Sequence, residues 1–203
     1  MKRLRADRES IEEAVAVLRA GGVVAYPTDT LYGLAVDPRS NTAVERLFAV
    51  KGRERTQAIP LIAGDIAQAR LAGRFTAEAL RLARASWPGP VSIVVDAQPA
   101  LSRALVNEDG TVAIRVPAQR YARDLAQAFG FCITSTSANL SGEPATASPD
   151  AVAVALADRI DLLLDAGTAP GGSPSTIVAF RDGAPVLVRA GAIAWERVLE
   201  FLE

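Results

Sequence analysis

The sequence contains no histidine among its 203 residues, and it contains a single cysteine, Cys132. The absence of histidine removes the commonest general base and the commonest metal ligand from any mechanism that this chain could use. One cysteine can form neither an intrachain disulfide nor a thiolate metal cluster. Any catalysis must therefore rely on carboxylates, Lys and Arg, hydroxyls, backbone amides, or a metal ion that the substrate carries.

The chain also lacks an excess of charge and a long apolar run. It has 22 Lys and Arg residues against 23 Asp and Glu residues, so the net charge does not indicate nucleic acid as a ligand, although it does not exclude a local basic cleft. The first five residues are not the start of a signal peptide, and no segment approaches the length of a membrane span. We expect a soluble, cytoplasmic protein with no membrane partner.

Two familiar nucleotide-binding motifs are missing. The sequence has neither the G-x-x-x-x-G-K-[ST] pattern nor the G-x-G-x-x-G pattern. The stretch AGTAPGGS (166–173) is rich in glycine but matches neither of them, and alone it is more typical of a loop. If the protein binds a nucleotide, it must use another arrangement of donors.

Helix and strand patterns alternate along the chain without a repeat or a long linker. Apolar, β-rich runs predict strands at 23–26, 59–63, 91–95, 111–116, 131–134, 162–164, 176–180 and 185–188. Helices are predicted from capping-box patterns at 10–13 and 42–45, and at 65–72, 76–85, 121–129, after Ser148-Pro149 and near 193. Asp182-Gly183 indicates a hairpin. We therefore expect an α/β fold with a mixed sheet, in a single domain that spans residues 1–203.

Small polar side chains gather directly after several predicted strands. They lie at 28–30, 135–139 and 173–176. Hydroxyls and free backbone amides at strand ends can hold phosphate or carboxylate oxygens. For any one of these clusters alone, turn chemistry is the preferred explanation, because Ser, Thr, Asn and Asp favour turns. The recurrence of three such clusters favours a binding site.

The basic residues allow two interpretations. Lys51 and Arg53 follow a predicted helix, where the helix dipole alone favours cations. Arg115 lies inside the apolar stretch VAIRVP (112–117), and an inward-facing arginine there needs an anionic partner. Strand alternation supports a solvent-facing Arg115 just as well.

Seven short stretches, taken in order, resemble the YrdC family of threonylcarbamoyl-AMP synthases. They span nearly the whole chain and are YPTDTLYGL (26–34), KGR (51–53), WPGP (87–90), AIRVP (113–117), SANLSG (137–142), PSTIV (174–178) and RAG (189–191). The resemblance implies a twisted mixed sheet flanked by helices around a deep concave cleft. It implies the synthesis of threonylcarbamoyl-AMP and pyrophosphate from L-threonine, bicarbonate and ATP, with Mg²⁺ accompanying ATP and no metal ligand from protein side chains.

The resemblance also assigns residues and partners. The positions matching those that hold L-threonine are Thr30, Arg115, Ser137 and Ser175, and those near ATP or its adenylate are Lys51, Arg53, Thr111, Asn139, Thr146 and Arg189. Among these, Lys51, Arg53 and Arg115 are expected to carry the catalysis, with Lys51 facing phosphate. Other proteins would then transfer the threonylcarbamoyl group to tRNA, and similar proteins bind double-stranded RNA.

Some positions depart from the family pattern or keep an open role. Similar proteins often have a histidine near Gly64 and another near Gln119, whereas this sequence has no histidine, and the longer relatives carry a further C-terminal domain, so we expect the short form of the family. Asp29 is a candidate general base by position, but we prefer it as a brace of its loop, with Tyr32 and Gly33 shaping the bend. The alternative function is a catalytically silent, RNA-binding protein of the same fold.

Overall fold

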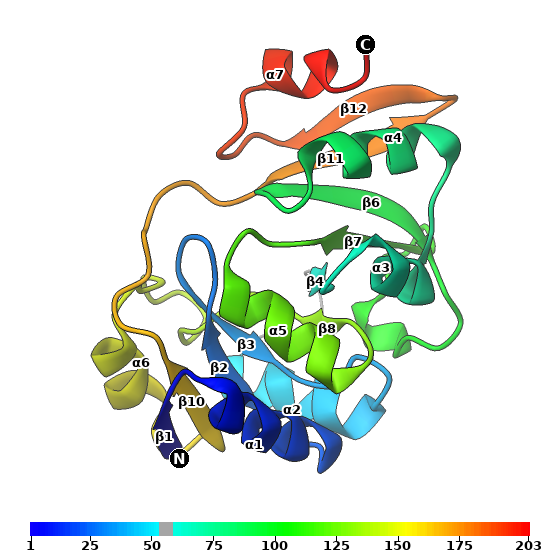
Figure 1. Ribbon diagram of the computed structural model, residues 1–203. Helices are drawn as coiled ribbons and strands as arrows, with labels where there is room; N and C mark the ends of the chain where they lie inside the picture. The colour runs from blue at the N-terminus through cyan, green and yellow to red at the C-terminus, as the bar shows by residue number, and fades with distance from the viewer. Residues whose placement is uncertain (53–58) are drawn as a thin grey trace.

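Two mixed β-sheets form the centre of the structure (Figure 1). The computed structural model describes residues 1–52 and 59–203. The strands are β1 (Lys2–Arg5), β2 (Val24–Pro27), β3 (Tyr32–Ala35), β4 (Leu61–Ile62), β5 (Gly73–Arg74), β6 (Val91–Ala97), β7 (Thr111–Arg115), β8 (Ile133–Thr134), β9 (Thr136–Ser137), β10 (Leu162–Asp165), β11 (Thr176–Arg181) and β12 (Ala184–Arg189). The first sheet has the order β1-β10-β2-β3-β9, and the second has the order β12-β11-β6-β7-β4-β8, with β5 paired to β6.

Both sheets combine parallel and antiparallel neighbours. In the first sheet β10 runs parallel to β1 and β2, whereas β3 is antiparallel to β2. In the second sheet β11 is parallel to β6 and forms an antiparallel hairpin with β12. Asp182 (φ 51°) and Gly183 (φ 80°) close that hairpin in the left-handed region, as an Asp-Gly turn requires. The prediction of an α/β fold with mixed sheets is confirmed.

Helices flank the two sheets. They are α1 (Arg8–Arg19), α2 (Asn41–Lys51), α3 (Ile66–Ala72), α4 (Ala77–Ser86), α5 (Arg120–Phe129), α6 (Pro149–Leu156) and α7 (Trp195–Glu200), with a short 3₁₀ helix at Arg103–Leu105. Six of them begin at a side-chain cap that accepts from a backbone N–H, and the capping residues are Asp7, Ser40, Asp65, Thr76, Gln119 and Ser148. Gly52 and Gly130, both left-handed, end α2 and α5.

Two predicted helix starts and one predicted bend are wrong. The capping box of α1 joins Asp7 and Ser10, so the helix begins one turn earlier than the pattern at 10–13 indicates. Likewise, Ser40 rather than Thr42 caps α2. Tyr32 and Gly33 do not shape a bend but begin the buried strand β3, which the sequence pattern did not reveal because its four residues are all buried and show no alternation.

The two sheets meet where β8 passes into β9. Thr134 of β8 accepts from the backbone N–H of Val36, just beyond β3, at 2.9 Å through Oγ1. Ser135, between β8 and β9, donates its backbone N–H to Pro60 at 2.8 Å. Backbone hydrogen bonds thus connect the end of the first sheet to the edge of the second, and the strand-end loops of both sheets lie together at this junction.

A continuous apolar core joins both sheets to the helices. It includes the fully buried aromatic rings of Tyr26 and Tyr32, and α1 and α5 pack against each other beside β10 and β2. Trp87 is buried in the WPGP turn and donates its indole N–H to the carbonyl oxygen of Val91 at 2.6 Å, so this residue packs the turn. The N-terminus lies at the first sheet, and the C-terminus lies at the opposite end of the molecule (Figure 1). Within the described residues, no helix has the length and apolar character needed to cross a membrane.

Candidate active site

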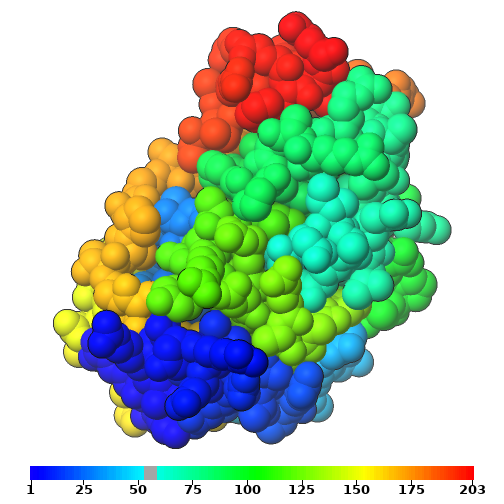
Figure 2. All heavy atoms as spheres, viewed as in Figure 1, coloured from blue at the N-terminus to red at the C-terminus, as the bar shows by residue number. Residues whose placement is uncertain are grey.

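A polar pocket of about 350 Å³ lies at the junction of the two sheets. Its walls come from the β2–β3 loop, β4, β6, the end of β7, the β8–β9 junction and the two ends of the β11–β12 hairpin. The lining residues are Thr28, Thr30, Leu31, Tyr32, Gly33, Pro60, Leu61, Ile62, Ser92, Arg115, Ser135, Thr136, Ser137, Pro174, Ser175 and Arg189. In Figure 2, blue atoms of the N-terminal part of the chain are visible between the orange atoms that precede β11 and the green atoms near α5. The three polar clusters of the sequence therefore share one pocket.

Arg115, at the end of β7, forms the charged floor of this pocket. Its guanidinium is paired with the carboxylate of Asp29, and only 9% of the Arg115 side chain and 12% of the Asp29 side chain are exposed. The inward orientation rules out the solvent-facing alternative. In the described part of the chain every buried side-chain nitrogen and oxygen has a hydrogen-bond partner. The Arg115 N–H groups that do not pair with Asp29 are therefore accessible, and they open towards the pocket that Arg115 lines.

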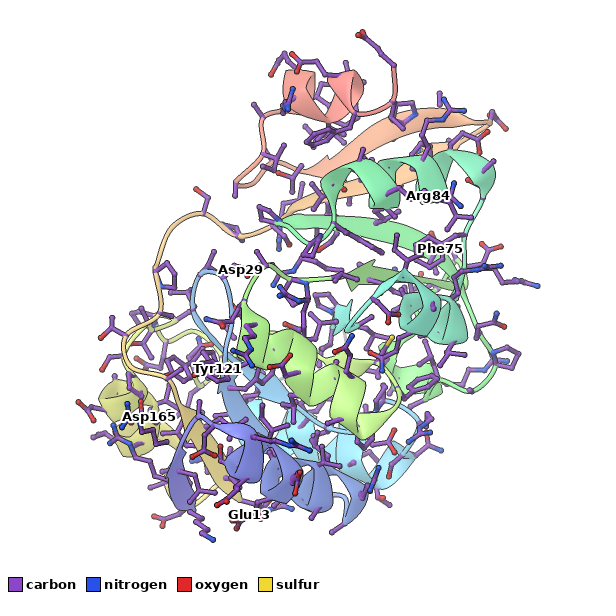
Figure 3. The ribbon with its side chains drawn as sticks, viewed as in Figure 1. Glu13, Asp29, Phe75, Arg84, Tyr121 and Asp165 are labelled. Carbon is purple, nitrogen blue, oxygen red and sulfur yellow. The ribbon has the colours of Figure 1, made fainter. Side chains whose placement is uncertain are left out.

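Asp29 braces its loop against the end of β7. One carboxylate oxygen accepts from Arg115 and the other accepts from the backbone N–H of Gln119. Figure 3 labels Asp29 in the β2–β3 loop, beside the segment that joins β7 to α5. Because both oxygens accept protein donors, the geometry agrees with the brace that we prefer for Asp29.

Arg189, at the end of β12, brings a second guanidinium to the pocket. It donates to the carbonyl oxygen of Ser175 at 2.7 Å and to its hydroxyl at 3.2 Å. The residue is exposed overall, but partial desolvation of its guanidinium and the positive charge of Arg115 both lower its pKa. Two guanidinium groups that repel each other across a pocket are stabilised by a bound anion.

Gly191 allows the segment after β12 to pack against the loop that carries Ser175. Ala192 donates its backbone N–H to Pro174 at 2.8 Å. A Cβ atom at Gly191 would lie 2.3 Å from the carbonyl oxygen of Pro174 and 2.5 Å from the backbone nitrogen of Thr176. Only glycine fits this close approach of two backbones, which explains the glycine of the RAG stretch.

The hydroxyl groups of Thr30 and Ser137 complete the lining of the pocket. Thr30 lies in the β2–β3 loop, and its carbonyl oxygen accepts from Gly171 at 2.8 Å. Ser137 ends β9 and also lines the pocket. The structure therefore brings together all four residues that the sequence predicts to hold L-threonine, namely Thr30, Arg115, Ser137 and Ser175.

Lys51 and Asn139 lie outside the pocket lining and support Ser137 and the residues that follow it. The Lys51 side chain is buried and donates to the carbonyl oxygens of Ser137 and Asn139 at 2.7 and 3.0 Å, and to Asn139 Oδ1 at 3.2 Å. Asn139 in turn donates to Leu140 at 2.9 Å and to Glu143 at 2.5 Å. In this structure the Lys51 ammonium faces protein oxygens, so it holds the loop after β9. Direct contact of Lys51 and Asn139 with ATP stays a prediction.

Thr111 and Thr146, which the sequence also predicts near ATP, lie outside the pocket lining. Thr111 starts β7, roughly 13 Å along the strand from Arg115, and its hydroxyl donates to Asp109 at 2.6 Å beside a separate hollow of about 320 Å³. Thr146 lies beside β3, where its carbonyl oxygen accepts from Tyr32 at 3.0 Å. The structure does not bring Thr111 to the pocket, and Arg53 lies outside the described residues.

Ser92 is the pocket residue that the sequence interpretation missed. It lies in β6, where it is 1% exposed, and its hydroxyl is 2.9 Å from that of Ser175. A signal was present, because Ser92 interrupts the apolar run VSIVV (91–95) in the same way that Arg115 interrupts its own strand. A polar residue between β-branched residues needs a partner on one face of the sheet.

Gly64, near which similar proteins often carry a histidine, is packed against α5. Its backbone N–H donates to Gln68 at 2.6 Å. A Cβ atom there would lie 2.1 Å from Cγ of Gln127. Gly64 does not line the pocket, so in this chain that position serves helix packing.

Comparison with known proteins identifies relatives over most of the chain. The Sua5/YciO/YrdC family model, described as "Telomere recombination", matches residues 16–191. The threonylcarbamoyl-AMP synthase of Vibrio cholerae is 39% identical over 172 residues, which are 83% of this chain and 92% of that protein. The Bacillus subtilis enzyme of the same name is 36% identical over 93% of this chain and 55% of its own length.

A solved structure agrees with the fold. The crystal structure of Pyrococcus abyssi Sua5 complexed with L-threonine superposes with a TM-score of 0.91 at 31% identity, covering 98% of this chain and 59% of that one. The chain thus spans little more than half the length of the Bacillus and Pyrococcus proteins, but nearly all of the Vibrio protein. By sequence and by fold, the chain belongs to the Sua5/YciO/YrdC family.

Proposed function

We propose that this protein is an L-threonylcarbamoyladenylate synthase, which makes threonylcarbamoyl-AMP and pyrophosphate from L-threonine, bicarbonate and ATP. The observation that carries the proposal is the convergence of Thr30, Arg115, Ser137 and Ser175 on one pocket that also holds Arg189. Relatives named threonylcarbamoyl-AMP synthase and a relative complexed with L-threonine support it.

Arg115 and the hydroxyl groups would bind the amino acid. The N–H groups of Arg115 that open towards the pocket can pair with the carboxylate of L-threonine. Thr30, Ser137 and Ser175 offer hydroxyls around it. Because Asp29 fixes one side of the guanidinium, the carboxylate would always meet the same edge of Arg115, which would fix the direction of the amino group.

The chemistry requires positioning and charge neutralisation rather than a histidine. The threonine nitrogen forms a bond to the carbon of bicarbonate and water leaves, which gives a carbamate. A carbamate oxygen then bonds to the α-phosphorus of ATP, and the bond to the β-phosphate oxygen breaks so that pyrophosphate leaves with the electron pair. Holding the three reactants in line and neutralising phosphate charge, here by Arg189 and the predicted Lys51 and Arg53, would supply most of the rate enhancement.

Mg²⁺ would accompany ATP. In residues 1–52 and 59–203 no three His, Cys, Asp or Glu side chains lie close enough to hold a metal ion. A metal bound mainly through phosphate oxygens fits this donor set, because Mg²⁺ is often held by substrate phosphates with few protein ligands. It would supply neutralisation of phosphate charge.

The product would serve tRNA modification. We propose that downstream proteins transfer the threonylcarbamoyl group to tRNA, and that the protein works in the cytoplasm, where ATP and tRNA meet. Since the net charge is −1, any contact with double-stranded RNA would use a local basic surface.

The test is direct. The purified protein is incubated with ATP, Mg²⁺, bicarbonate and L-threonine, and pyrophosphate and the adenylate are followed by a coupled assay and mass spectrometry. Pyrophosphate release should stop when either L-threonine or bicarbonate is omitted. Release that ignores L-threonine contradicts the proposal. No release, together with salt-dependent binding of double-stranded RNA, would support the catalytically silent alternative instead.

A further inference from the structure

Ser92 lines the pocket beside Ser175 but is almost fully buried, and its hydroxyl has one partner. Ser92 is 1% exposed, and among the described residues the hydroxyl of Ser175 is the partner of its side chain, at 2.9 Å. Ser175 directly precedes β11, lines the pocket and is only half-buried. The two oxygens therefore differ in access to the pocket, and this difference decides where their protons lie.

Counting protons gives the direction of the hydrogen bond. A serine hydroxyl has one proton and can accept two hydrogen bonds. If Ser175 donated to Ser92, the proton of Ser92 would be buried without an acceptor, which is costly. If Ser92 donates to Ser175 instead, the only proton of the Ser92 hydroxyl has an acceptor. Arg189 also donates to the Ser175 oxygen, at 3.2 Å, so that oxygen then accepts twice.

We infer that Ser92 is a positioning residue that donates to Ser175 and so directs the Ser175 proton into the pocket. With both lone pairs of Ser175 occupied by Ser92 and Arg189, its proton is left for a ligand. Ser175 then presents a donor and not an acceptor. Together with the guanidinium groups of Arg115 and Arg189, it forms a wall of donors that selects an anionic oxygen of the ligand and disfavours an ammonium group.

This inference rests on the proposed function for the identity of the ligand, L-threonine. The first experiment is a double-mutant cycle with Ser92→Ala, Ser175→Ala and the double variant, measured as KM and kcat of threonine-dependent pyrophosphate release. We expect Ser92→Ala to raise KM for L-threonine about three- to tenfold with little change in kcat, as loss of one hydrogen bond's orienting effect implies. In the Ser175→Ala background the same change should have no further effect on KM.

A matched control separates positioning from stability. Ser102 is also buried, at 4% exposure, and lies outside the pocket lining. Ser102→Ala should therefore leave KM for L-threonine unchanged even if it lowers the melting temperature. Additive effects of the Ser92 and Ser175 substitutions on KM, or an unchanged KM in Ser92→Ala, would overturn the inference.

A second measurement does not depend on activity. Neutron diffraction from crystals exchanged into D₂O locates the deuterium between the two oxygen atoms. We expect it on Ser92, pointing at Ser175. Deuterium on Ser175 pointing at Ser92 would overturn the inference but would leave the proposed function intact. A wild-type protein without turnover would overturn the proposed function, and the deuterium position would still decide which of the two hydroxyls donates.

Discussion

Replacing Asp29 by alanine would leave the Arg115 guanidinium without its carboxylate partner. The two side chains are 9% and 12% exposed, so the pair is largely shielded from water. Removing one partner of a buried ion pair costs about 3–5 kcal/mol, because the other charge stays buried. Arg115 also faces an open pocket from which water can solvate it, so we expect a cost below that range, about 2–3 kcal/mol of unfolding free energy.

The substitution also removes the acceptor of the Gln119 backbone N–H. Asp29→Asn keeps an oxygen for that N–H but loses the charge, so its stability should fall between those of the wild type and Asp29→Ala. For a chain of this size, a loss of 2–3 kcal/mol corresponds to a melting temperature lower by roughly 4–12 °C. Thermal and urea denaturation of the three proteins would measure this order.

An exposed ion pair provides the control. The side chains of Arg120 and Asp124 are 79% and 33% exposed, and such pairs contribute little to stability. Asp124→Ala should therefore change the melting temperature much less than Asp29→Ala. If Asp29→Ala is as stable as the wild type, or if Asp124→Ala is equally damaging, the argument that Asp29 is a structural brace is refuted.

Four further results are expected. Arg115→Ala should abolish threonine-dependent pyrophosphate release while circular dichroism shows a folded protein, and normal turnover would contradict the carboxylate-binding role. Gly191→Ala should lower the melting temperature and raise KM for L-threonine, because its methyl group would collide with the backbone at 174–176; an unchanged KM would mean that the loop adapts. Burial raises the pKa of the Cys132 thiol to about 12, so the thiolate should be negligible at neutral pH. A thiol reagent should therefore modify Cys132 only as the protein unfolds, and rapid labelling of the folded protein at neutral pH would contradict this. Gly64→His should destabilise the protein without increasing turnover, and a gain in threonine affinity would show that α5 moves aside.

The fold was largely predictable because local signals agreed with the tertiary structure. The Asp-Gly hairpin and the Ser148-Pro149 helix start lie where the sequence places them. The missed elements include the short strands β3 and β9, and β9 pairs with β3 about a hundred positions away. No periodicity marks a fully buried strand of a few residues.

The site was predictable in its composition but not in its contacts. Alternation along β7 could not say whether the face that carries Arg115 is covered, because the loop that covers it, with Asp29, lies 86 positions earlier in the sequence. The helix dipole explains a lysine at the end of α2, yet Lys51 donates its hydrogen bonds to the carbonyl oxygens of Ser137, which ends β9, and of Asn139. Contacts of this kind are set by the junction of the two sheets, which no local pattern encodes.

The charges at the pocket explain how a chain with a net charge of −1 can bind anions. Among the described residues at the pocket, Arg115 and Arg189 carry two positive charges and Asp29 carries one negative charge, which leaves an excess of one positive charge. Partial desolvation, and after it the positive charge of Arg115, lowers the pKa of Arg189. One carboxylate would neutralise the excess, so affinity for an anion comes from two converging guanidinium groups and not from the overall charge of the surface. The salt sensitivity of ligand binding should therefore come mainly from Arg189, which is exposed, because Arg115 is shielded from bulk solvent.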